Sequence, residues 1–498
     1  MNMKLFWKKA VIITAVLAAC GAALYGLWAA GMLLPGWVYW ESGSITGESG
    51  DYEVSLEERT VHVAYHGAEI WQSPKEIKVQ QAVLGDIDLD GRDELILLCW
   101  KRGRFGAYKP FWIERDEKDW SQHIFVYDCA GEKIVPQWMS SYIGQDVTEM
   151  ASGGKGQARW LLLTDPEGEV SYWRWDSWGF TKDDAEVSFA VFGDNLIHEP
   201  IYRYGMNQGG DFDFLFENIE DILKESDISV INQETPLVTE FSEYGDYPRF
   251  GTPVQVGEAI ADAGFDVVTC ATNHALDRGA KGIHTTKDCF AERGLLCLGI
   301  QTQEEPERKP YELIRRNNIR FALFNYTYGT NGVPLPKESP YMVHLLEDEA
   351  QIREDIDSAR READVILVFV HWGTENSEEI DAFQKKWTDI FLDSQVDVVV
   401  GSHPHVLQDH EMLEGEDGHK MLVYYSVGNF VSAQPEKACT RGGVAEFSIA
   451  PVPGGYAISE YSLTPLVIRW EKGGKYTAVL PDGKGIDGNG KQKSIFKG

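Results

Sequence analysis

From about residue 185 onward, short apolar runs alternate with amphipathic segments, and this alternation restricts the possible folds more than any other feature of the chain. The apolar runs have the length of buried strands, and the segments between them have the spacing of helices. Such an order indicates a layered α/β domain. Strands are expected at 188–193, 228–232, 266–271, 321–325, 365–370 and 396–400, and helices at 212–224, 253–263, 281–293, 347–362 and 384–393.

The preceding part of the chain has a different pattern. Between residues 52 and 184, short apolar runs are separated by Gly, Asp and Pro, which is typical of strands joined by turns. The 498 residues are also too many for one ordinary domain. We therefore expect a β-rich domain at 52–184, an α/β domain at 185–465, and a C-terminal strand with a disordered tail at 466–498.

The N-terminus carries a long uncharged run. Residues 10–40, 31 in all, contain no charged side chain and follow three lysines. This length exceeds the ~20 apolar residues that a helix needs to cross a bilayer, and lysines before such a run favour a cytoplasmic N-terminus. The sequence therefore predicts a cytoplasmic segment at 1–9, a single-pass anchor in the cytoplasmic membrane at 10–40, a linker at 41–51, and later domains outside the cell.

A lipoprotein signal at Cys20 is the alternative for this segment. Leu17 to Cys20 reads Leu-Ala-Ala-Cys, which fits the lipobox pattern. The residues from Gly21 to Trp40 remain apolar, however, whereas the first residues after a cleaved signal are usually polar. This favours an uncleaved anchor over lipidation or cleavage.

The charge of the chain restricts its partners. There are 46 Lys and Arg against 78 Asp and Glu, which gives a formal net charge of −32. Nucleic-acid binding needs basic patches, so this balance argues against a nucleic-acid partner. The seven cysteines are scattered without zinc-like spacing, and we expect most of them to be buried free thiols.

An Asp-rich segment in the β-rich part has the spacing of a calcium loop. Asp86, Asp88 and Asp90 place carboxylates at alternate positions, Gly91 permits a sharp turn, and Glu94 supplies an acid at the ninth position. The segment resembles the calcium loops of FG-GAP/VCBS repeats and predicts a structural Ca²⁺ site. The alternative is a hairpin turn that holds no ion.

Polar side chains that can bind metals follow most strands of the α/β domain. Ligands of open α/β sheets bind at this end of the strands. Five of the twelve histidines fall there, together with carboxylates and an asparagine. Imidazole and carboxylate ligands together suit Mn, Zn or Fe, and a set of this size can hold the two-metal arrangement used in hydrolysis. The candidate residues are Asp194, His198, Glu234, Asn273, His274, Asp277, His371, His403 and His405.

The motifs around these residues together resemble one known family. They are Gly193-Asp194, Asn232-x-Glu234, ATNHALDRG at 271–279, HWGTE at 371–375, GSHPHVLQ at 401–408 and YSVGNF at 425–430. In order and spacing they are similar to the CapA/PgsA poly-γ-glutamate capsule biosynthesis family, which belongs with the calcineurin-like metallophosphoesterases. The resemblance implies a four-layer α/β/β/α sandwich.

The resemblance also implies roles for the candidate residues. Asp194, His198 and His405 would bind a first transition metal, and Asn273, His371 and His403 a second. Glu234 would bridge the two metals, His274 would act as general acid and Asp277 would orient it. Two features depart from the superfamily pattern: the Asp-to-His spacing of the first motif is wider, and Glu234 replaces the usual bridging Asp.

These features predict a metal-dependent hydrolase that acts on a phosphoester or a γ-glutamyl amide of a cell-surface polymer. The alternative is a non-enzymatic component of capsule synthesis or export, in which the same residues hold a structural or vestigial metal. Both hypotheses name the polymer or its synthesis and export machinery as the partner. A surface adhesin, which relies only on the β-rich part, ranks last.

Overall fold

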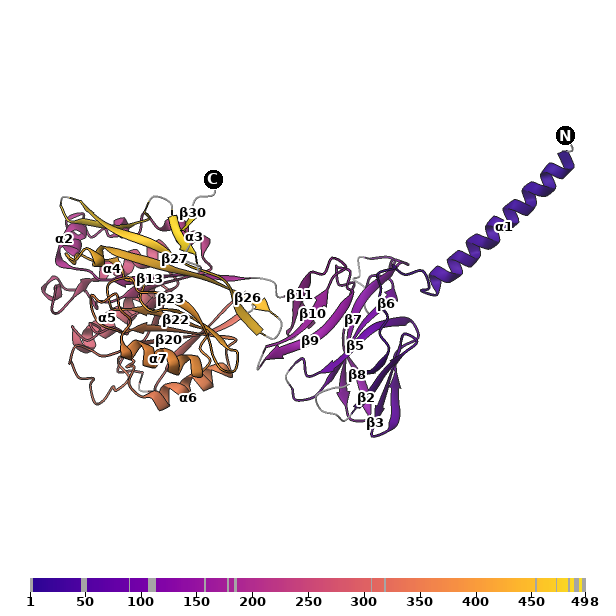
Figure 1. Ribbon diagram of the computed structural model, residues 1–498, viewed down its shortest axis with the longest axis horizontal. Coiled ribbons are helices and arrows are strands. Elements are labelled where there is room, and N and C mark those ends of the chain that lie inside the picture. The colour runs from indigo at the N-terminus through magenta and orange to yellow at the C-terminus, as the bar shows by residue number, and fades with distance from the viewer. Residues whose placement is uncertain are drawn as a thin grey trace. The chain divides into compact units, whose positions relative to one another are not determined.

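The computed structural model divides the chain into two compact units, Met1–Asp184 and Ala185–Gly498 (Figure 1). It describes residues 3–45, 52–88, 90–105, 113–155, 158–176, 179–182, 186–305, 307–317, 319–452, 455–471, 473–481, 484–487 and 492–494. The expected linker at 41–51 lies outside these residues at 46–51. The expected disordered tail lies outside them at 482–483, 488–491 and 495–498.

The first unit begins with helix α1 (Met3–Ala29). Within the described part of the chain, no helix has the length and apolarity needed to traverse a bilayer. This finding contradicts the predicted single-pass anchor across residues 10–40 and the cell-membrane localisation that follows from it.

The uncharged run is also not one element. Helix α1 ends at Ala29, and the residues that follow form turns and irregular backbone in contact with the β-rich part. The indole of Trp120 donates a hydrogen bond to the carbonyl of Trp28 (2.8 Å). The guanidinium of Arg59 donates to the carbonyl of Gly31 (3.0 Å) and lies over the ring of Trp40.

The rest of the first unit consists of three four-stranded antiparallel sheets, in the orders β1-β2-β3-β4, β5-β6-β7-β8 and β12-β11-β10-β9. The middle sheet packs on both faces: Leu95 and Leu97 of β6 join the core shared with the first sheet, and Ile96 and Leu98 join the core shared with the third. This double burial accounts for the uninterrupted apolar run of β6. The strands are β1 (Gly43–Ile45), β2 (Tyr52–Glu57), β3 (Thr60–Tyr65), β4 (Ala68–Gln72), β5 (Ile77–Gly85), β6 (Glu94–Arg102), β7 (Trp120–Ala130), β8 (Lys133–Met139), β9 (Glu149–Lys155), β10 (Ala158–Thr164), β11 (Val170–Asp176) and β12 (Gly179–Lys182).

The second unit contains two large mixed sheets, so the predicted α/β class is confirmed. The first sheet has the order β18-β17-β14-β13-β26-β27, continued by β29 and β30, and the second β19-β20-β21-β22-β24-β23. The first sheet contains β13 (Val187–Asn195), β14 (Ile228–Gln233), β17 (Val267–Thr269), β18 (Leu296–Leu298), β25 (Asn429–Val431), β26 (Arg441–Val452), β27 (Gly455–Glu471), β28 (Lys475–Val479), β29 (Lys484–Asp487) and β30 (Gln492–Ser494). The second contains β19 (Tyr311–Arg316), β20 (Ile319–Thr327), β21 (Val365–His371), β22 (Val398–Ser402), β23 (His410–Glu414) and β24 (Lys420–Tyr424), and β15 (Leu237–Val238) pairs separately with β16 (Thr252–Pro253).

The two sheets face each other, and helices cover their outer faces, which gives four layers. A core that includes Phe189, Val230, Phe321 and Leu367 lies between the sheets. On the outer face of the first sheet pack α2 (Glu199–Asn207), α3 (Glu220–Glu225), α4 (Val254–Ala263) and α5 (Gly279–Glu292). On the outer face of the second pack α6 (Glu349–Arg360) and α7 (Ala382–Asp393) (Figure 1).

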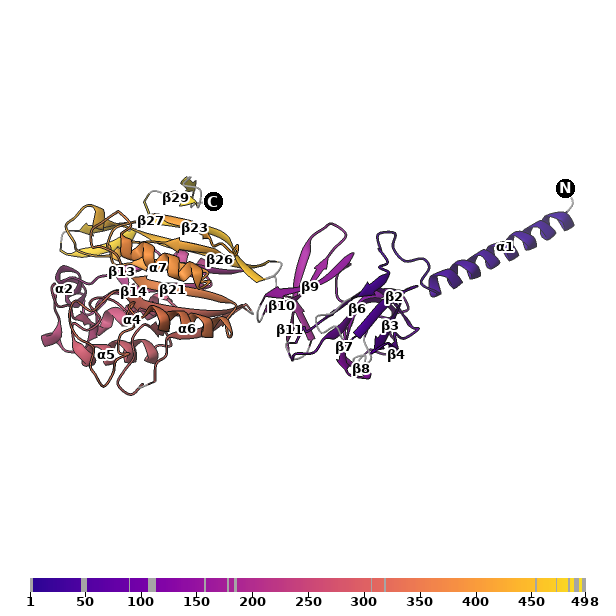
Figure 2. The same cartoon turned by 60° about the horizontal axis from the view of Figure 1, so that its bottom comes forward.

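The parallel strands of each sheet determine where the candidate site lies. Strands β13, β14 and β17 run parallel in the first sheet, and β20, β21 and β22 run parallel in the second. Their carboxyl ends therefore carry the loops that follow them to one edge of each sheet. On its other side β13 pairs in antiparallel fashion with β26, which forms a long hairpin with β27 (Figure 2).

Candidate metal centre

Both sheets contribute to one buried polar cluster at the carboxyl ends of their strands. From the first sheet come Asp194, near the end of β13, and Glu234, directly after β14. From the second sheet come His371, the last residue of β21, and His403, directly after β22. All four side chains are at most 2% exposed, so the cluster lies below the surface.

Asp194 links the two sheets through hydrogen bonds. Its Oδ1 accepts from the Nδ2 of Asn232 (2.7 Å), and its Oδ2 accepts from the backbone N–H of His403 (3.2 Å). The Nδ1 of His405 lies 3.1 Å from the same Oδ2. Asn232 is itself held by the hydroxyl of Thr269 (3.0 Å), so the Asn of the Asn-x-Glu motif positions the Asp194 carboxylate.

Glu234 is buried with no hydrogen-bond partner on either carboxylate oxygen. Its Oε1 lies 3.6 Å from the Nε2 of His371 and 3.8 Å from the Nε2 of His405. Burial alone would raise the pKa of Glu234, but the electrostatic attraction of His405 and the contact with His371 lower it below its ordinary value. A buried, charged carboxylate without hydrogen bonds is costly, and a cation bound by both oxygens would remove that cost.

Three imidazoles surround this carboxylate. The Nδ1 of His403 faces the Nε2 of His371 at 3.2 Å, and that Nε2 lies 2.9 Å from the Oδ1 of Asn273. Burial and the neighbouring imidazole of His371 lower the pKa of His403 well below its usual range, so this ring keeps a free lone pair. Burial would lower the pKa of His405 too, but the carboxylates of Glu234 and Asp194 raise it to about 9.

The backbone at His403 and His405 is strained. Their φ angles are +96° and +61°. Residues other than Gly and Asn rarely adopt this left-handed region of the backbone. Non-glycine residues in such conformations cost about 1–3 kcal/mol each and gather at functional sites. This strained backbone directs the imidazoles of His403 and His405, which are two residues apart, toward the same cluster.

The cluster fits a metal centre. Ligand atoms of Glu234, His403 and His405 lie within 4.8 Å of one another. The partnerless carboxylate, the neutral imidazole of His403 and the nearby Asp194 and Asn273 form a donor set of the kind that binds Mn, Zn or Fe.

His274 and Asp277 form a separate pair beside the cluster. The Oδ2 of Asp277 lies 2.8 Å from the Nδ1 of His274 and accepts a hydrogen bond from the backbone N–H of Phe250 (2.8 Å). Burial would lower the pKa of His274, but the hydrogen bond to Asp277 and the charge of Glu234 raise it above its ordinary value. The structure brings these two candidate residues into direct contact.

His198 lies at the start of α2, close enough to the cluster for its imidazole to interact electrostatically with Glu234 and His405. It is the N-cap residue of α2, where its Nδ1 lies 3.2 Å from the carbonyl of Leu196 and accepts from the N–H of Ala433 (3.3 Å). Strand β13 ends at Asn195, so the wide spacing in the first motif carries His198 past the strand and onto the helix. Its ring packs edge-on against Phe250.

The sequence interpretation missed several polar contacts of the cluster. Asn429, which the YSVGNF motif contains, places its Oδ1 3.0 Å from the Nδ1 of His405. The hydroxyl of Ser402 lies 3.0 Å from the Nδ1 of His371 and fixes that ring. Tyr328, directly after β20, packs its ring 4.6 Å from that of His403. The YSVGNF and GSHPH motifs signalled the first two residues, and the position of Tyr328 after a strand was the signal for the third.

The Asp-rich loop brings its carboxylates together as well. Ligand oxygens of Asp86, Asp88 and Asp90 lie within 4.8 Å of one another. Glu94 points back and accepts from the N–H of Ile87 (2.9 Å). Burial, with added repulsion from Asp88 and Asp90, raises the pKa of Glu94 to about 8.

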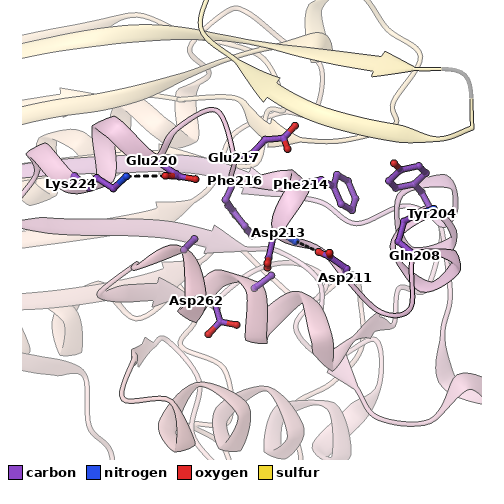
Figure 3. A pocket seen from close by; sticks show the side chains of 12 residues that line it. Tyr204, Gln208, Asp211, Asp213, Phe214, Phe216, Glu217, Glu220, Lys224 and Asp262 are labelled. Carbon is purple, nitrogen blue, oxygen red and sulfur yellow. Dashed lines mark hydrogen bonds and ion pairs between the residues drawn. The ribbon is translucent and has the colours of Figure 1, made fainter.

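A cavity of about 610 Å³ lies elsewhere, on the outer helical layer between α2, α3 and α4. Tyr204 and Phe214 stand at one end, and Asp211, Asp213 and Asp262 line its middle (Figure 3). None of the residues of the metal cluster lines it. This cavity is therefore separate from the candidate centre.

Comparison with known proteins identifies the second unit. Residues 188–434, which include all the clustered residues, match the family described as "Bacterial capsule synthesis protein". Residues 188–434 therefore carry a domain of this family. The predicted CapA resemblance is confirmed, whereas the resemblance of the Asp-rich loop to FG-GAP/VCBS repeats stays a prediction.

Two relatives are CapA proteins. The chain is 27% identical to the capsule biosynthesis protein CapA of Bacillus anthracis over 347 residues, which cover 65% of this chain and 78% of that one. It is 25% identical to the PGA biosynthesis protein CapA of Bacillus subtilis (strain 168) over 285 residues, which cover 55% and 73%.

Solved structures give a weaker likeness. The match to the Haemophilus influenzae NAD nucleotidase covers 63% of this chain and 54% of that one, with 11% identity and a TM-score of 0.38. A putative 5′-nucleotidase from Staphylococcus aureus covers 56% and 54%, with 14% identity and a TM-score of 0.37. Scores this low carry no argument, so the four-layer description rests on the sheets and helices of this chain.

Proposed function

We propose that this capsule-family protein is a metal-dependent hydrolase in the synthesis or export of a cell-surface polymer such as poly-γ-glutamate. The bond cleaved would be a phosphoester or a γ-glutamyl amide. One observation carries the proposal: the Glu234 carboxylate is buried among three imidazoles, and neither of its oxygens has a hydrogen-bond partner. The names of the CapA relatives support the polymer.

Two divalent transition-metal ions are the proposed cofactors. Asp194 and His405 would hold one ion, Asn273, His371 and His403 would hold the other, and Glu234 would serve both. When bound, such a pair supplies an activated water and polarises the bond that is attacked. His198 would complete the first site; its imidazole interacts electrostatically with Glu234 and His405, and its Nδ1 contacts backbone groups of Leu196 and Ala433.

His274 is the proposed general acid. Its Nδ1–H is committed to Asp277, so Nε2 is the atom that can give a proton to the leaving group. Because the pKa of His274 is raised, the ring keeps this proton to a higher pH than an ordinary histidine does. Asp277 is anchored by the N–H of Phe250 and therefore fixes the direction of the imidazole.

A non-enzymatic role in a capsule synthesis or export complex is the second candidate. It is favoured by the depth of the cluster, because His371, His403 and His405 are 0%, 2% and 3% exposed. In this role the same residues would hold a structural metal, and the chain would act by binding its partners.

Metal analysis of the purified full-length chain tests both candidates. We expect about two transition-metal ions per chain, lost in a His403→Ala/His405→Ala variant and kept in a His284→Ala variant, whose histidine lies on α5 away from the cluster. The loaded protein is then screened against aryl phosphoesters and γ-glutamyl anilides. Metal with turnover supports the hydrolase, metal without turnover supports the second candidate, and absence of metal after reconstitution overturns the centre.

We also propose a structural Ca²⁺ at the Asp86–Asp90 loop. The convergence of three carboxylates on one point supports it. Calcium should raise the melting temperature of the full-length chain, and an Asp88→Ala variant should lose that response. Equal melting temperatures with calcium and with EGTA would contradict the site.

A further inference from the structure

The metal cluster has few exposed neighbours, and Tyr328 is one of them. Asn273 and His403, which it touches, are 1% and 2% exposed, whereas Tyr328 is 39% exposed. Its ring lies 4.6 Å from that of His403, and its hydroxyl lies near the side chain of Asn273. One face of this side chain therefore meets solvent while its polar end meets the cluster.

The turn that carries Tyr328 is held in place. Its backbone N–H donates to the carbonyl of His371 (3.0 Å), which ties the turn to the end of β21. Two hydrogen bonds close the turn. The hydroxyl of Thr330 donates to the carbonyl of Val333 (2.6 Å), and the N–H of Val333 donates to the carbonyl of Thr330 (2.9 Å). The phenol is thus positioned before any ligand arrives, which reduces the ordering cost of a contact.

Asn331 extends the same polar rim. Its Oδ1 accepts from the Nδ2 of Asn273 at 3.4 Å, and its Nδ2 lies 3.4 Å from the Nδ1 of His274. Both contacts are long, and the residue is exposed. The turn therefore presents the hydroxyl of Tyr328 and the amide of Asn331. These groups lie beside the ligands of the proposed second metal and beside the proposed general acid, His274.

We propose that Tyr328 contacts the substrate, donating its hydroxyl hydrogen bond to an oxygen of the group that is cleaved. The inference rests on the proposed metal centre and adds a residue that the family motifs quoted above do not include. The oxygen belongs to a phosphoryl group or to the tetrahedral form of a γ-glutamyl amide. Both present an oxygen anion at the same place, and a phenol hydroxyl satisfies either.

Calorimetric binding to the Mn²⁺-loaded full-length chain tests this role. The probes are inorganic phosphate, for the phosphoryl group, and glutamate γ-hydroxamate, for the amide. In a Tyr328→Phe variant we expect affinity for the probe that wild type binds to fall about tenfold, the value of one hydrogen bond to a charged oxygen. Manganese content and melting temperature should not change. The matched control is Tyr341→Phe, because Tyr341 is similarly exposed (36%) and packs instead near Arg308.

The outcomes separate the two proposals. Affinity in Tyr328→Phe within about twofold of wild type would overturn the role of Tyr328 and leave the metal centre standing. A wild type that holds manganese but binds neither probe would also overturn it. Failure of the wild type to hold manganese would overturn the metal centre, and the role of Tyr328 with it. The probe that binds identifies the class of bond.

Discussion

Replacing Asp277 tests the proposed acid pair directly. Its Oδ2 accepts hydrogen bonds from the Nδ1 of His274 and from the backbone N–H of Phe250, both at 2.8 Å. The side chain of Asp277 is 3% exposed. Asp277→Ala removes both bonds and leaves a buried N–H without a partner. With about 1.5–3 kcal/mol for each bond to a charged group, we expect a loss of about 3–6 kcal/mol.

Asp277→Asn separates shape from charge. The amide oxygen can still accept from Phe250, so only the charge-assisted part of the His274 bond is lost, about 1–2 kcal/mol. A domain of this size shifts its melting temperature by about 2–4 °C per kcal/mol. We therefore expect decreases of about 6–24 °C for the Ala variant and about 2–8 °C for the Asn variant, measured by calorimetry in a chelator.

The Asn variant also makes a prediction about pH. The pKa of His274 is raised in the folded protein, so the pair stabilises the fold fully below the ordinary value of 6.5 and loses this contribution as pH rises through the folded pKa. The cost of Asp277→Asn should accordingly be larger at about pH 5.5 than at about pH 8.5. Equal costs at the two pH values, or equal costs for the Asn and Ala variants, would refute the reasoning.

Three further changes have definite expected outcomes. The pKa of Glu94 is raised to about 8 from 4.5, so its ionisation destabilises the fold as pH rises through this range; Glu94→Gln should flatten the pH dependence of melting in EGTA, and an unchanged slope would argue against buried ionisation. Gly401→Ala would place a methyl carbon 2.1 Å from the carbonyl oxygen of Tyr425 and should cost more than about 4 kcal/mol by urea unfolding; a cost below about 1 kcal/mol would show that the backbone yields. The thiols of Cys270 and Cys297 lie 3.6 Å apart, so oxidised glutathione should cross-link them, with peptide mass spectrometry as the check; recovery of both as separate peptides would contradict this proximity.

Local sequence patterns predicted much of the α/β unit. The apolar runs expected at 188–193 and 228–232 are β13 and β14, and both strands are almost entirely buried. The helix expected at 212–224 is instead a 3-10 turn at Asp213–Leu215 followed by α3. Its apolar residues have helical spacing and are buried, and the structure offers no simple reason for the break.

Other features depend on contacts that no local pattern contains. The end of α1 at Ala29 coincides with contacts from Trp120 and Arg59 far along the chain, whereas the sequence showed only an uncharged run. The position of His198 at the start of α2 depends on where β13 ends, and strand ends are the least certain part of a prediction from sequence. The missing partners of Glu234 became visible only when its three-dimensional surroundings were known.

The pairing of β13 with β26 has a consequence for how the chain is made. Val187 pairs with Ile449, so about 260 residues separate the two strands. At synthesis rates of about 5–20 residues per second, β13 leaves the ribosome on the order of ten to fifty seconds before its partner. During that interval the strand that carries Asp194 has an unpaired edge, and such an edge invites wrong pairing. We therefore expect a chain that ends before β26 to expose this edge of β13 and to aggregate more readily than the full-length chain.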